Sequence, residues 1–77
     1  MLQEIRSLVG DNIRGYRHKA EMTQARLAAL ADINMFYLGE LERGKVNVSI
    51  DVLARVSKEL NTPIHLFFIE ESYKTQN

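Results

Sequence analysis

The chain has no cysteine and only one proline, Pro63, among its 77 residues. Without cysteine it can form neither a disulfide framework nor a thiolate metal site, so it needs no oxidising compartment. Its longest purely apolar run is only a few residues, which predicts no transmembrane helix and no signal peptide. We therefore expect a cytoplasmic protein with no membrane partner.

An excess of charge of either sign is also missing. Ten basic and ten acidic residues give a formal net charge of zero, so composition alone does not favour nucleic-acid binding. Any basic face has to come from the placement of charges. Hydrophobic residues make up 45% of the chain, which predicts a globular fold rather than disorder. We expect one domain over residues 1–77, with its core at about 9–68 and a polar, frayed tail at 70–77.

Patterns that carry catalysis or metal binding are not evident. His18 and His65 fall in different predicted helices, and neither has a cluster of other ligands beside it. There is no glycine-rich phosphate loop and no Ser-His-Asp set. We therefore predict no catalytic residue, no metal, no cofactor, no small-molecule effector and no enzyme activity.

What the chain does contain is helical periodicity. Near the N-terminus, apolar residues recur at intervals of three and four, as on one face of an amphipathic helix. They are Leu2, Ile5, Val9, Ile13, Tyr16 and Ala20. The full pattern predicts an all-α fold of five helices, at about 2–20, 24–30, 35–43, 50–60 and 63–70.

Signals at the helix ends support these boundaries. Good N-cap residues precede three of the helices, each with hydrophobic-staple spacing around it, and Pro63 suits the first position of the last helix. The caps are Thr23, Asn34 and Ser49. Residues suited to a left-handed conformation follow the second, third and fourth helices. These are Asp32, Gly44 and Asn61.

Residues 24–43 fit a helix-turn-helix unit. Ala28 is small enough for two helices to cross closely, while Leu38 and Leu41 place the core contact on one face of the second helix. The opposite face is then free to enter a DNA major groove. A plain helical bundle without a DNA function would produce much of the same pattern.

The residues around this unit resemble a known family. The segments IRGYR, MTQARLA and YLGELERGKVNVSI, with Leu60-Asn61-Thr62-Pro63 near the end, are similar to the Xre/Cro family of lambda-repressor-like DNA-binding domains. The chain looks most like the controller proteins of restriction–modification systems. Phage repressors and small antitoxins share the domain. The resemblance implies a five-helix transcriptional regulator that binds a double-stranded DNA operator as a homodimer.

The resemblance also implies which residues contact DNA. They are Gln24, Asn34, Met35, Phe36, Tyr37, Glu40, Arg43, Lys45 and Asn47. Gln24 would contact a phosphate or a base edge, and residues 43, 45 and 47 would position the domain along the backbone. Arg17 and Glu42 match a structural salt bridge of the family.

Met35 and Phe36 depart from the family, which often carries Arg, Gln, Ser or Thr at these two positions. They could contact thymine methyl groups or a deformable base step, bind a protein partner, or fold back onto the core. Glu40 could accept a hydrogen bond from cytosine or pair with a neighbouring arginine.

The C-terminal part is expected to form the dimer. Ile50, Leu53, Val56 and Leu60 are predicted to face the core. The last helix carries more apolar bulk than one short helix can bury under a small domain, so part of it should meet a second copy. The predicted interface residues are Ile64, Leu66, Phe67, Phe68 and Ile69. The alternative to a dimeric DNA-binding regulator is a protein-interaction module, such as an antitoxin, whose Met35–Phe36 surface binds a protein.

Overall fold

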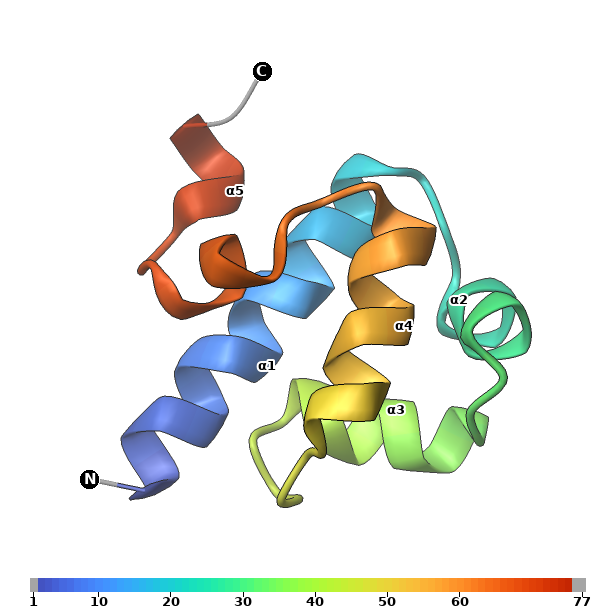
Figure 1. The fold of residues 1–77 in the computed structure, drawn as a ribbon, viewed down its shortest axis with the longest axis horizontal. Helices are drawn as coiled ribbons and strands as arrows, with labels where there is room; N and C mark the ends of the chain where they lie inside the picture. Colours follow the sequence, from blue (N-terminus) through green and yellow to red (C-terminus); the bar gives the residue numbers. More distant parts are fainter. Residues whose placement is uncertain (1, 76–77) are drawn as a thin grey trace.

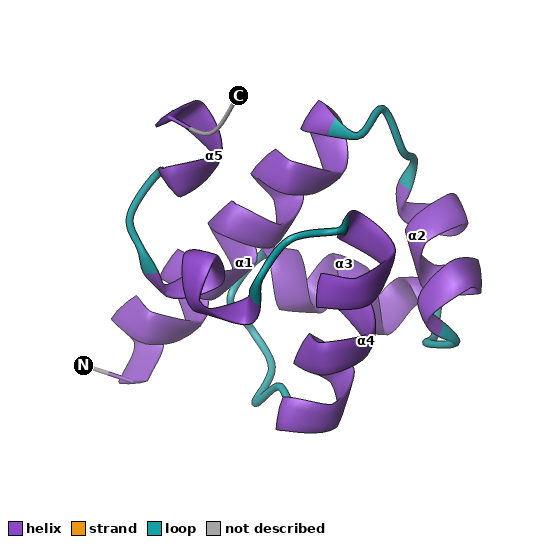
Figure 2. Ribbon diagram, turned by 45° about the horizontal axis from the view of Figure 1, so that its top comes forward, coloured by secondary structure: helices purple, strands orange, loops and turns teal. Residues whose placement is uncertain are grey.

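A computed structural model describes residues 2–75 and contains helices joined by short loops, with no strand in that range (Figure 2). The elements, in chain order, are α1 (Leu2–Lys19), α2 (Gln24–Ala31), α3 (Met35–Glu42), α4 (Ile50–Leu60), the 3₁₀ helix η1 (Ile64–Phe68) and α5 (Ser72–Thr75). The all-α prediction and the first four helices are confirmed, each boundary within one residue. In Figure 1, α2 and α3 lie on the opposite side of the molecule from η1 and α5.

The helix ends are built as the sequence predicts. Each N-cap side chain accepts a hydrogen bond from the backbone nitrogen three residues on, at 3.0 or 3.1 Å. These caps are Thr23, Asn34 and Ser49. Asp32, Gly44 and Asn61 adopt positive φ angles of 56°, 74° and 51°. Local chemistry thus fixes where α2, α3 and α4 begin and how the chain leaves them.

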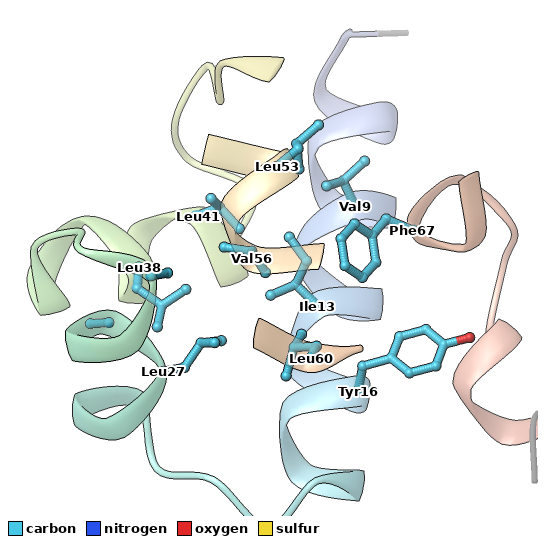
Figure 3. Close-up of a cluster of buried hydrophobic side chains, with 12 residues drawn as sticks. Val9, Ile13, Tyr16, Leu27, Leu38, Leu41, Leu53, Val56, Leu60 and Phe67 are labelled. Carbon is cyan, nitrogen blue, oxygen red and sulfur yellow. The ribbon is translucent and has the colours of Figure 1, made fainter. Parts of the chain in front are cut away.

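One apolar core joins five of the elements. Figure 3 shows buried side chains from α1, α2, α3, α4 and η1 converging between the helices. The labelled members are Val9, Ile13, Tyr16, Leu27, Leu38, Leu41, Leu53, Val56, Leu60 and Phe67. Because α2 and α3 both contribute to this core, the two helices are held rigidly relative to α1 and α4.

The C-terminal segment differs from the prediction. Instead of one helix over 63–70, the chain forms η1 and then the separate helix α5. The amide nitrogen of Asn12, fully buried, donates to the carbonyl oxygens of Phe67 at 2.8 Å and Ile69 at 2.9 Å. These long-range bonds satisfy two carbonyls at and just after the end of η1 without a continuing α-helix. They hold this end of η1 against α1.

The predicted frayed tail is wrong over residues 72–75. Ser72 is buried and accepts a hydrogen bond from the Tyr16 hydroxyl at 2.9 Å. The Tyr73 ring lies edge-on to that of Tyr16, with 6.2 Å between ring centroids. Residues 76 and 77 of the predicted tail lie outside the described residues. Helix α5 therefore packs against α1.

Candidate nucleic-acid interface

The interface is built on the crossing of α2 and α3. In Figure 1, α2 is seen nearly end-on while α3 runs across the view, so the two helices cross steeply. Ala28 is buried near the crossing, and Leu38 and Leu41 fix α3 to the core. Helix α3 therefore keeps one face inside the protein and presents the other outward.

A buried polar network holds α3 against α1. The guanidinium of Arg17 donates twice to the Glu42 carboxylate, at 2.7 and 3.0 Å, and once to the carbonyl of Met22 at 2.8 Å. Gln24, at the start of α2, donates to the same carboxylate at 3.0 Å. The pair expected from the family resemblance is thus present, and it links α1, α2 and α3. Such bidentate, charge-assisted geometry fixes orientation as well as adding energy.

The outward face of α3 changes character along its length. Met35 and Phe36 begin the helix and are 52% and 75% exposed, so the interpretation that they fold back onto the core is wrong. One turn further on, Glu40 forms an ion pair with Arg43. Of the two roles that the sequence suggested for Glu40, the structure shows the pairing with a neighbouring arginine. The face therefore runs from an apolar N-terminal end to a paired charge at the C-terminal end.

Tyr37 and Asn34 contribute differently from the other predicted residues. The Tyr37 ring is half-buried and packs against the core. Asn34 is exposed, and its side-chain oxygen caps α3 by accepting from the Tyr37 backbone nitrogen at 3.1 Å. Both residues help to hold the first turn of α3 in place.

A cleft of about 380 Å³ borders this face and brings together residues of α1, α2 and α3. Gln24 and Arg43 line it, together with Arg14 and His18 of α1, which the sequence reasoning did not assign to the interface. Arg14, Arg17 and His18 are spaced at i, i+3 and i+4, which places all three on one helix face. This spacing could have predicted the two additional residues from the sequence. Glu42 also lines the cleft and is paired with Arg17, so Arg14 and Arg43 supply the net positive formal charge of the cleft beside the acidic α3.

The loop after α3 contains the remaining predicted residues. Lys45 and Asn47 are exposed. Gly44, which precedes them, has a φ of +74°, and an added Cβ would lie 2.8 Å from Ser7. Its carbonyl also accepts a hydrogen bond from the Gln3 side chain at 2.9 Å. The loop is therefore anchored to α1, with its polar residues outward.

The predicted dimer residues separate into three groups by burial. Phe67 is fully buried in the core of its own protomer, so its assignment to a surface is wrong. Ile64 and Leu66 are half-buried, whereas Phe68 and Ile69 are about half exposed. Ile50 was predicted to face the core but is 78% exposed, so that prediction is also wrong.

An apolar groove gathers several of these exposed residues. Leu2 and Ile5 of α1, Ile50 of α4 and Phe68 of η1 line it together with the buried Leu53, and the polar residues Arg6 and Asn47 also border it. Leu2 and Ile5 belong to the amphipathic face of α1 but lie beyond the protomer's own core. The groove therefore contains apolar side chains that the single protomer leaves exposed.

The described part of the chain contains neither a membrane-spanning helix nor a cluster of metal-ligating side chains. None of its helices combines the length and apolar character needed to cross a membrane. Within the same residues, no group of three or more His, Cys, Asp or Glu side chains is placed to hold a metal ion.

The family model described as "Helix-turn-helix" matches residues 13–67 of the chain. The chain belongs to this helix-turn-helix family, and it is a DNA-binding transcriptional regulator rather than an enzyme. The match includes α2, α3 and most of the core, so the family and the geometry define the same unit.

Several named regulators are similar to this chain. It is 39% identical over 61 residues to the control protein C.BamHI of Bacillus amyloliquefaciens, covering 78% of this chain and 75% of that protein. The restriction-modification controller protein C.AhdI of Aeromonas hydrophila has a similar structure, with a TM-score of 0.79 and 27% identity over 82% of this chain and 96% of that chain. The clp gene regulator ClgR of Corynebacterium glutamicum has a TM-score of 0.82 and 30% identity, over 92% and 73% of the two chains.

Proposed function

We propose that this regulator binds an inverted-repeat operator as a homodimer and acts as the controller protein of a restriction–modification system in the cytoplasm. The observation that carries the proposal is the rigid α2–α3 unit, whose outward helix face lies beside a basic cleft. The likeness to C.BamHI and C.AhdI supports the controller role, while ClgR is a regulator of other genes with the same fold.

In this proposal α3 enters the major groove and the cleft meets the phosphate backbone. Met35, Phe36 and Glu40 would face the base edges, with Asn34 at the helix start and the part of Tyr37 that the core leaves exposed beside them. The residues proposed to contact phosphate are Gln24, Arg43, Lys45 and Asn47, with Arg14 and His18 added from the cleft. Because Arg43 already pairs with Glu40, binding a phosphate would exchange one partner for another.

The apolar groove supports a two-fold dimer. We propose that Phe68 and Ile69 meet the second copy together with Leu2, Ile5 and Ile50, since all five side chains are exposed in the protomer. A protomer measures 29 × 28 × 18 Å. The geometry of such a dimer would set the distance between its two α3 helices, and so the spacing of the two half-sites of the operator.

Selection of bound sequences from random double-stranded DNA tests the function. We expect an inverted repeat to be recovered, and its complex to weaken steeply as salt concentration rises. Arg43→Ala should weaken binding to the selected operator and to unrelated DNA by similar factors, because a phosphate contact carries no sequence information.

Failure of the proposal would be equally visible. Recovery of no preferred sequence, with no retarded complex at low salt, would contradict operator binding. A selected site without inverted symmetry would contradict the dimer while leaving DNA binding intact. An operator that lies in no restriction–modification gene cluster would contradict the controller role alone.

A further inference from the structure

The first two residues of α3 hold the position from which a helix-turn-helix protein contacts bases. In such proteins the N-terminal residues of the second helix contact base edges in the major groove. Here those residues are Met35 and Phe36, directly after the cap Asn34. Both side chains are largely exposed in the protomer.

Three polar side chains near these two residues already have partners within the protein. The Asn34 side-chain oxygen is used by the cap, Glu40 is paired with Arg43, and Gln24 donates to Glu42 at 3.0 Å. Reading bases through these groups would require breaking an internal contact. The two apolar side chains have no such contact to lose, so they are the side chains most available to the groove.

Among the groups that bases present in the major groove, the C5 methyl of thymine is the apolar one. We propose that Met35 and Phe36 specify T·A pairs by packing against thymine methyl groups, making the operator preference depend on a methyl group rather than on hydrogen bonds. This inference rests on the proposed operator binding. It adds which residues discriminate and which atom of the DNA they recognise.

Replacing thymine by deoxyuridine tests the inference directly. The change removes the C5 methyl and leaves base pairing intact, so it isolates the proposed contact. In duplexes of the selected operator, each thymine is replaced in turn and the dissociation constant is measured with the full chain. We expect one or two positions in each half-site to lose about fourfold in affinity, the effect of one methyl group leaving an apolar contact.

Variants connect that loss to the two side chains. Phe36→Ala or Met35→Ala should bind the thymine and deoxyuridine duplexes equally at the sensitive position. Arg43→Gln is the matched control, because it should lower affinity for both duplexes by the same factor and keep the discrimination. Circular dichroism checks that each variant stays folded, as expected for exposed side chains.

A second DNA substitution checks the methyl group by itself. 5-Methylcytosine carries a methyl group at the corresponding position of the major groove. At a sensitive position, a 5-methylcytosine·guanine pair should therefore bind more tightly than an unmodified cytosine·guanine pair, and Phe36→Ala or Met35→Ala should abolish that difference.

Three results would overturn the inference. Deoxyuridine could change affinity by less than twofold at every position of a site that the wild-type protein binds well. The discrimination could persist in both Phe36→Ala and Met35→Ala. Loss of a protein complex, with DNA affinity and discrimination unchanged in the variants, would assign the surface to a protein partner. If wild-type protein binds no operator at all, the proposed function itself has failed.

Discussion

Asn12 shows how much one polar residue determines in a domain of this size. It is fully buried, and its amide joins α1 to the carbonyls of Phe67 and Ile69 at 2.8 and 2.9 Å. Asn12→Leu would leave both carbonyls without this donor, and a buried unsatisfied polar group costs about 1–3 kcal/mol. We expect the free energy of unfolding, measured by urea denaturation, to fall by roughly 2–4 kcal/mol.

A charged variant at the same residue separates hydrogen bonding from side-chain volume. Asn12→Asp is nearly the same size, but its carboxylate cannot donate and burial raises its pKa. A raised folded-state pKa means that the stability from the protonated form is present at low pH and is lost as pH rises. The variant should therefore be closest to wild type below about pH 4. Equal stability of Asn12→Leu and wild type would contradict the role given to the amide.

At the scale of helices, two glycines mark close approaches to α1 and predict opposite outcomes. A Cβ on Gly10 would lie 2.7 Å from the carbonyl oxygen of Glu42, which is backbone and cannot turn aside. A Cβ on Gly15 would instead overlap the Tyr73 ring, a side chain of the short α5. Gly10→Ala should thus lower the free energy of unfolding by about 2 kcal/mol or more, since the clash outweighs the gain of about 1 kcal/mol in helix propensity.

Gly15→Ala is the matched comparison on the same helix. We expect it to displace α5 while leaving the rest of the domain close to wild-type stability. Hydrogen exchange should show reduced protection confined to residues 72–75. Global destabilisation by Gly15→Ala, or none by Gly10→Ala, would contradict this account of the two contacts.

The sequence predicts an element well when the interactions that form it join neighbouring residues, and poorly when they join distant parts of the chain. The N-caps and left-handed turns were predictable because each depends on a few neighbouring residues. The role of Phe67 was reversed for a different reason. In η1, 3₁₀ winding with three residues per turn changes which side chain faces inward, and Asn12, 55 residues away, donates to the Phe67 carbonyl.

The candidate site follows the same rule. The boundaries of the helix-turn-helix unit could be predicted from local patterns. The Arg17–Glu42 pair could be predicted from the family resemblance. Arg14 and His18 were not assigned, because their place beside Gln24 and Arg43 depends on how α1 packs against α2 and α3. The exposure of Phe36 was likewise open until the direction of the first turn of α3 was known.

At the scale of the whole molecule, the apolar groove and the DNA-binding face have different proposed functions, dimerisation and operator binding. The groove lies between the N-terminal half of α1, the loop at Asn47, the start of α4 and η1, whereas the basic cleft lies between α1, α2 and α3. A dimer through the groove would double the number of phosphate contacts without changing either reading face. Affinity and its salt dependence should then both depend on self-association.

Ile50→Glu tests that coupling. Ile50 is 78% exposed, so the change should leave the protomer folded while placing a charge in an apolar interface. Sedimentation equilibrium should show a monomer at concentrations where wild type is a dimer. On the operator, the slope of log affinity against log salt should fall to about half its wild-type value, because one protomer neutralises half the phosphates. Phe36→Ala is the control that stays dimeric. A dimeric Ile50→Glu with an unchanged salt slope would place the dimer interface elsewhere on the protein.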